Sequence, residues 1–151
     1  MLRIAKRAVC ATVCSTVAAG LFAAAAFAGP IEDRQKAMEQ VGDAMKILAA
    51  IAKKQQPFDA AVVKAEAEKA AAAFEKAKDL FPEGSDKGEK ETYAKPEIWT
   101  DRATFDADLK KAHDAAVAMA AVTEEGQFMP ALQALGGNCK GCHDRFRRPK
   151  E

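Results

Sequence analysis

The sequence predicts an all-α fold, an antiparallel four-helix bundle. Four stretches carry apolar residues at alternating spacings of three and four, which is the pattern of one buried helix face. No stretch keeps the every-second-residue alternation of a half-buried strand. Most connections between the stretches are short, as they are between antiparallel neighbours in a bundle.

The first predicted helix runs from about residue 31 to residue 53. Its buried stripe comprises Met38, Val41, Met45, Leu48 and Ala52. Gln55-Gln56-Pro57 ends it, because proline cannot continue a helix. Asp59 can cap the second helix, which Pro82 ends. The buried stripe of this second helix comprises Val63, Ala67, Ala70, Phe74, Ala77 and Phe81.

A polar connection, residues 82–96, precedes the third helix and is long for a compact domain, so it is either a crossover or a functional loop. The third helix begins at Thr100 or Asp101 and ends at Gly126. Its core positions are Phe105, Leu109, Ala112, Ala116 and Met119. Met129-Pro130 opens the fourth helix, with proline near the first turn, where its missing N–H costs nothing. Its inward stripe comprises Leu132, Leu135, Cys139, Cys142 and Phe146.

The fourth predicted helix carries Cys139-Lys140-Gly141-Cys142-His143, the Cys-x-x-Cys-His pattern of haem c attachment. Because residues three and four apart share a helix face, both cysteines can reach one porphyrin and form thioethers with its vinyl groups. His143 can then bind the iron as the proximal ligand. We therefore expect one covalent haem c per chain. Gly136 and Gly137 lie inside this predicted helix, where each glycine costs about 1 kcal/mol relative to alanine. We interpret them as letting the helix backbone approach the flat haem closely. The alternative is that they are a tolerated irregularity of the helix.

Three other uses of the cysteine pair fit the sequence less well. A structural zinc site needs four ligands, and the chain offers one further histidine, His113. A thioredoxin-like redox pair needs a βαβ context, which the helical pattern does not provide. An exported protein could join the two cysteines in a disulfide, but the adjacent His143 favours haem.

The first 28 residues have the pattern of a cleaved export signal. The basic residues of its n-region are Arg3, Lys6 and Arg7. Residues 8–25 form an apolar h-region, and Ala26-Phe27-Ala28 is an A-x-A cleavage site before Gly29. An uncleaved membrane anchor is the alternative, since the apolar run approaches the length that spans a bilayer.

Cleavage after residue 28 leaves residues 29–151 as one domain of 123 residues. It removes Cys10 and Cys14, so that only the cysteines of the attachment pattern remain. It also removes three basic residues and no acidic one, which changes the net charge from +1 to −2. Nothing in this charge indicates nucleic acid or an anionic membrane as a partner.

The residues alone leave open what lies on the other side of the iron. The candidates for a sixth ligand are His113, Met38, Met45, Met119 and Met129. We interpret His113 as a surface histidine and Met45 and Met119 as core filling. Met38 lies near the start of the first helix. In an antiparallel bundle with the first and fourth helices adjacent, that end faces the haem-bearing stretch, so Met38 is either an iron ligand or a core methionine.

Three motifs follow one another along the mature chain. They are Arg34-Gln35-x-x-Met38, Pro96-Glu97-Ile98-Trp99 and the stretch from Cys139 to Arg147. The first resembles the Arg-Gln element on the first helix of the cytochrome c-prime family, the class II c-type cytochromes. The second resembles the family's Pro-x-Ile-Trp segment, and the third its haem helix with an aromatic and a basic residue after the histidine. The resemblance covers essentially the whole mature chain.

This resemblance implies a periplasmic four-helix bundle, often dimeric, that holds one covalent haem. Cys139 and Cys142 would hold the haem, and His143 would bind its iron. The resemblance also implies that Arg34 neighbours a haem propionate and that Arg147 lies by the proximal face.

The residue that matches the distal position of the family is Met38. In a low-spin branch of the family this residue is a methionine that ligates the iron, and in the high-spin branch it is a bulky plug over five-coordinate iron. Met38-Glu39-x-x-Gly42 and the long second connection are more similar to the low-spin branch.

We therefore expect an electron-transfer protein with His143 and Met38 as axial ligands, served by redox partner proteins. The alternative is a five-coordinate protein that binds nitric oxide or carbon monoxide. An enzyme such as a peroxidase needs an open iron with distal acid–base groups, and the sequence offers no distal histidine, so no enzymatic activity is expected.

Overall fold

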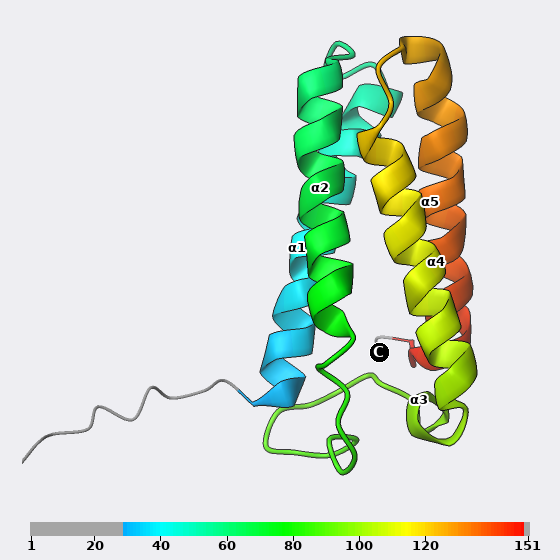
Figure 1. Cartoon of the computed structure of the whole chain (residues 1–151). Helices are drawn as coiled ribbons and strands as arrows, with labels where there is room; N and C mark the ends of the chain where they lie inside the picture. The colour runs from blue at the N-terminus through cyan, green and yellow to red at the C-terminus, as the bar shows by residue number, and fades with distance from the viewer. Residues whose placement is uncertain (1–28, 150–151) are drawn as a thin grey trace, which may run out of the picture.

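The computed structural model describes residues 29–149, so the predicted export signal lies outside the described residues. The helices are α1 (Pro30–Ala52), α2 (Ala60–Ala77), α3 (Glu97–Thr100), α4 (Arg102–Ala120) and α5 (Glu125–Phe146). The four long helices form an antiparallel bundle, and α3 is a single turn at one end of it (Figure 1). Since the described residues contain no strand, the predicted all-α four-helix bundle is confirmed.

The helices pack in the order α1 on α2, α2 on α4 and α4 on α5. The α2–α4 seam contains alanines that are completely buried, among them Ala67, Ala70 and Ala116. Small side chains let two helices approach closely. In contrast, α1 and α5 are not a closely packed pair. The first turns of α1 and the last turns of α5 lie at the same end of the bundle (Figure 1).

The predicted stripes form the core, although not all of their members are buried to the same degree. Leu48, Val63, Met119 and Leu135 are the largest fully buried side chains. Other members are only partly buried and pack against the edge of the core: Met38, Met45, Ala52, Leu132, Cys139 and Cys142. These partly buried residues belong to α1 and α5, the two helices that do not pack closely together.

The predicted end of α2 at Pro82 is wrong, because the helix ends at Ala77. The chain leaves the helix through a looser turn, in which the N–H of Leu80 bonds the carbonyl of Ala77 at 3.1 Å. Arg102 of α4 donates to the carbonyls of Lys78 (3.2 Å) and Phe81 (2.9 Å). These bonds satisfy carbonyls that a continued helix would have paired. Phe81 is nevertheless buried, as its place in the stripe predicts.

The predicted boundary between the last two helices is also wrong. α4 ends at Ala120, and α5 begins at Glu125, so that Gly126 and Pro130 lie inside α5. A capping box sets this start: the side chain of Gln127 accepts the N–H of Glu124 at 3.3 Å, and the Glu124 side chain accepts a backbone N–H in return. The single turn α3 was not predicted. Among residues 29–149, no helix is long and apolar enough to cross a membrane.

Candidate haem site

The two cysteines of the attachment pattern lie one turn apart on α5. Both are partly buried against the core, and they are free thiols rather than a disulfide. Burial raises the pKa of the Cys139 thiol. Burial and, to a smaller extent, the nearby Asp108 carboxylate raise the pKa of Cys142 to about 11. Within residues 29–149, no three His, Cys, Asp or Glu side chains are grouped so that they could hold a metal ion, as zinc would require.

His143 directly follows Cys142 and is also partly buried. Burial, followed by the positive charge of Arg147, holds the pKa of the His143 imidazole below its ordinary value. The ring is therefore neutral at neutral pH, which is the form that binds iron. Among the described residues its nitrogens have no hydrogen-bond partner. His143 borders a surface cavity of about 260 Å³, which Lys95, Arg147 and Arg148 also line.

The candidate sixth ligands differ in burial and in position along the bundle. Met38 is partly buried in the first half of α1, at the end of the bundle where α5 carries its cysteines. Met45 is partly buried two turns further along α1. Met119 is completely buried in α4, and Met129 is 44% exposed near the start of α5. Of the methionines on α1, Met38 is the nearer to the end that holds His143.

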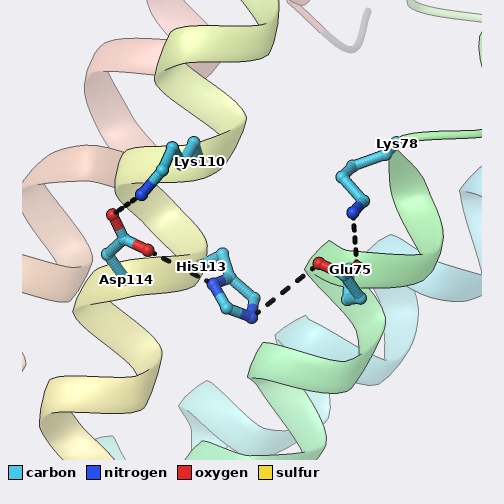
Figure 2. Close-up of polar contacts among 5 residues, drawn as sticks. All are labelled: Glu75, Lys78, Lys110, His113 and Asp114. Atoms are coloured by element: carbon cyan, nitrogen blue, oxygen red, sulfur yellow. Dashed lines mark hydrogen bonds and ion pairs between the residues drawn. The ribbon is translucent and has the colours of Figure 1, made fainter.

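His113 lies between α4 and α2, in a chain of charged side chains on the surface (Figure 2). Its Nδ1 is 3.4 Å from a carboxylate oxygen of Asp114, and its Nε2 is 4.0 Å from one of Glu75. Lys110 and Lys78 pair with these two carboxylates. The hydrogen bond from Lys78 holds the pKa of Glu75 below its ordinary value. His113 therefore contacts surface carboxylates, which fits its interpretation as a surface histidine.

Arg34 of α1 is 3% exposed, and the long connection between α2 and α3 surrounds its guanidinium. The guanidinium donates to Ser85 Oγ (3.0 Å), to the Ser85 carbonyl (2.8 Å) and to Thr92 Oγ1 (2.8 Å). It also lies over the rings of Phe81 (5.0 Å to the centroid) and Trp99 (5.7 Å). Its position beside a propionate stays a prediction. Its bonds to the connection are a feature that the sequence did not predict.

Arg147 is the first residue after α5 and is exposed. Its backbone forms an isolated antiparallel bridge with Ala94 of the connection. Arg147 lines the same cavity as His143, and its positive charge contributes to holding the pKa of the His143 imidazole below its ordinary value. Whether it also lies beside the bound haem stays a prediction.

Sequence reasoning missed Asp108 of α4. Its side chain is only 10% exposed, and it accepts from Arg145 (3.0 Å) and Lys111 (3.2 Å). Its charge acts on the thiol of Cys142. One signal could have found it: Asp108 lies three residues after Phe105 and four before Ala112, and therefore on the predicted buried stripe of that helix.

The family model described as Cytochrome C' matches residues 29–147. The chain belongs to the cytochrome c' family. A cytochrome c' of Pararhodospirillum photometricum is 44% identical over 120 residues, which cover 78% of this chain and 94% of that protein. A cytochrome c-556 of Agrobacterium fabrum is 37% identical over 125 residues, which cover 82% of this chain and 84% of that protein.

Solved cytochrome c' structures have the same fold. The structure of cytochrome c' from Rhodopseudomonas palustris matches with a TM-score of 0.76 and 35% identity, and covers 82% of this chain and 99% of that chain. The nitric oxide complex of a cytochrome c prime variant from Alcaligenes xylosoxidans matches with a TM-score of 0.71 and 29% identity, over 82% of this chain and 99% of that chain.

Cytochrome c' proteins hold one covalent haem c per chain, and this chain is a monohaem c-type cytochrome. The residues present fit this group. Cys139 and Cys142 offer two unpaired thiols on one helix face, and His143 offers a neutral imidazole with unengaged nitrogens. The partly buried faces of α1 and α5 leave apolar surface that a flat group between these helices would cover.

Proposed function

We propose that this cytochrome is a periplasmic carrier of single electrons whose iron is bound by His143 and Met38. The haem supplies the one-electron change of its iron when it is bound. The observation that carries the proposal is where the two candidate ligands lie. Met38 is in the first half of α1 and His143 is in the last turn of α5, at the same end of the bundle. These helices are not closely packed together.

Each side chain has a separate role in this proposal. Cys139 and Cys142 attach the cofactor through thioethers, and His143 is the proximal ligand. A thioether sulfur from Met38 favours ferrous iron and raises the reduction potential. With His143 and Met38 both bound to the iron, the site would offer no open position for a substrate. An iron site whose two protein ligands do not change is suited to the exchange of electrons with redox partner proteins.

Two further observations support the proposal. Cytochrome c-556 proteins are among the relatives of this chain, one of them at 37% identity, alongside cytochrome c' proteins. The family match begins at Gly29, the residue that follows the predicted cleavage site. This agrees with residues 1–28 being an export signal that directs residues 29–151 to the periplasm.

A second candidate function is binding of nitric oxide or carbon monoxide at five-coordinate iron. A cytochrome c prime from Alcaligenes xylosoxidans has been solved as a nitric oxide complex, and a cytochrome c' is 44% identical to this chain. In that case Met38 is a distal plug and His143 is the single axial ligand from the protein.

Visible spectra of the oxidised and reduced holoprotein, with and without carbon monoxide, decide between these functions. The proposal expects a low-spin spectrum, a sulfur-to-iron band in the far red when oxidised, and slow or absent uptake of carbon monoxide. A high-spin spectrum with ready uptake selects the gas-binding function. The intact mass of periplasmic protein, measured in the same preparation, should equal residues 29–151 plus one haem. A mass that includes the signal or lacks haem contradicts the proposed export or attachment.

A further inference from the structure

The long connection between α2 and α3 crosses the end of the bundle where the cysteines and Met38 lie. It passes beneath the first turn of α1 and then returns toward α3, beside the end of α5 (Figure 1). Because α1 and α5 do not pack closely, their spacing at this end is not set by direct contact between the two helices. The connection touches both of them.

On the α1 side, hydrogen bonds from two neighbouring residues hold the connection, and those from Arg34 are buried and charged. Arg34 donates to Ser85 and to Thr92 Oγ1, while Gln35 donates to the carbonyl of Glu91 at 2.7 Å. Thr92 is 8% exposed, so that its hydroxyl is shielded from water. Hydrogen bonds with an ionised donor are stronger than neutral ones. The first turns of α1 are therefore fixed to the connection at Thr92.

On the α5 side, the same few residues are joined to the segment that follows the helix. The N–H of Lys95 donates to the carbonyl of Phe146 at 2.9 Å, and the N–H of Arg148 donates to the carbonyl of Tyr93 at 2.7 Å. The guanidinium of Arg148 donates to the carbonyl of Thr92. Thr92 thus accepts from Arg34 through its hydroxyl and from Arg148 through its carbonyl.

We propose that Arg34, Thr92 and Arg148 form a clasp that sets the spacing of α1 and α5 and so holds Met38 within bonding reach of the iron. This inference rests on the proposed ligation by Met38. Met38 lies one turn after Arg34 on the same face of α1, so a shift of α1 at Arg34 also moves Met38. The three residues are positioning residues, because they act on the iron through Met38.

Three variants open the clasp at different points: Thr92→Val, Arg34→Leu and Arg148→Ala. Valine keeps the shape of threonine but removes the hydroxyl that Arg34 and the N–H of Ala94 share. Thr92→Val is therefore the mildest change and keeps the test informative if Arg34→Leu does not fold. Each variant should increase the carbon monoxide affinity of the reduced holoprotein by at least about tenfold, and should weaken the sulfur-to-iron band.

Arg102→Leu is the matched control. Arg102 also donates to carbonyls near the start of the connection and lies over an aromatic ring, Phe105, at 5.6 Å. Its bonds join α4 to that segment rather than α1 to α5. This control should lose stability without a change in carbon monoxide affinity. If the clasp variants also lose stability without a change in carbon monoxide affinity, the clasp has only a structural role and the inference is wrong.

A Met38→Ala background separates this inference from the proposed function. If the clasp acts through Met38, Thr92→Val should change carbon monoxide affinity less than about twofold in that background. A tenfold change there overturns the inference. A high-spin spectrum of the unmutated protein overturns the ligation by Met38. It then also overturns this inference, whereas an unchanged carbon monoxide affinity of the clasp variants in a low-spin protein overturns the inference alone.

Discussion

The α2–α4 seam and the facing surfaces of α1 and α5 are built in opposite ways. The seam is lined by completely buried alanines, such as Ala70 and Ala116. The inner faces of α1 and α5 carry partly buried methionines and cysteines and do not close on each other. The seam is therefore fully buried by protein side chains, whereas the partly buried faces of α1 and α5 are the surfaces that a haem attached to Cys139 and Cys142 would cover.

This difference explains how one small bundle can combine a rigid pair of helices with a face that binds a cofactor. Close packing of α2 on α4 fixes the frame, because well-packed interiors resist displacement. The adaptable side chains lie on α1 and α5, where methionine sulfur and cysteine thiols can contact a bound group. Changes to the cofactor face should alter spectra and stability together, whereas changes to the seam should alter stability alone.

The largest effect should follow from removing both anchors with Cys139→Ser and Cys142→Ser. Without a covalent haem, the stabilisation that comes from a tightly held ligand is lost, about 4 kcal/mol or more. Amide hydrogen exchange should accelerate first in α1 and α5 and last in the α2–α4 seam. Mass spectrometry checks that the haem is absent. Uniform loss of protection across all four long helices would contradict the division into two regions.

Met38→Ala should come next in size. Truncation of a buried methionine costs about 2–5 kcal/mol, and we expect the lower part of that range because Met38 is only partly buried, plus the loss of an iron–sulfur bond. The ferrous protein should become high-spin and bind carbon monoxide readily, with His143 still the proximal ligand. Absorption spectra and carbon monoxide titration measure this. Met45→Ala is the control on the same helix and should leave the spectrum unchanged.

Ala116→Leu tests the other region. Ala116 is completely buried in the seam, so a larger side chain must displace its neighbours, at about 1–3 kcal/mol. Thermal unfolding should report this loss, while the visible spectrum and the carbon monoxide affinity should match those of the unmutated protein. A change in axial ligation caused by this substitution would show that the two regions are coupled.

The sequence predicts the buried face of each long helix and the attachment pattern well, because both are local features. Spacings of three and four identify the buried faces of all four long helices, and Cys139, Cys142 and His143 lie within one turn and a half of each other. Helix ends were predicted less well. The start of α5 is set by the local capping box of Glu124 and Gln127, but the end of α2 depends on a distant side chain. Arg102 pairs the carbonyl of Lys78, which is 24 residues away, and no local pattern indicates this.

The surroundings of Arg34 show the limit of sequence reasoning most clearly. Its hydrogen-bond partners Ser85 and Thr92 are 51 and 58 residues away, in a connection without regular structure. The path of such a loop depends on tertiary contacts rather than on periodicity. The sequence identified Arg34 and the connection as separate features, and only the fold brings them together.

The smallest predicted effect is that of Arg147→Ala on the reduction potential. A positive charge near the iron destabilises the ferric form, so its removal should lower the potential, on the order of 20–60 mV, where 59 mV is a factor of ten for one electron. The effect should be modest because Arg147 is exposed, and it should shrink in high salt, which screens exposed charges. Helical circular dichroism should be unchanged.

The control for this change is Lys64→Ala, which removes one positive charge from α2 at the opposite end of the bundle. It should leave the potential nearly unaltered. Voltammetry of both variants at low and high salt therefore separates a local field at His143 from a general effect of net charge. An unchanged or higher potential for Arg147→Ala would mean that its guanidinium does not act on the proximal side.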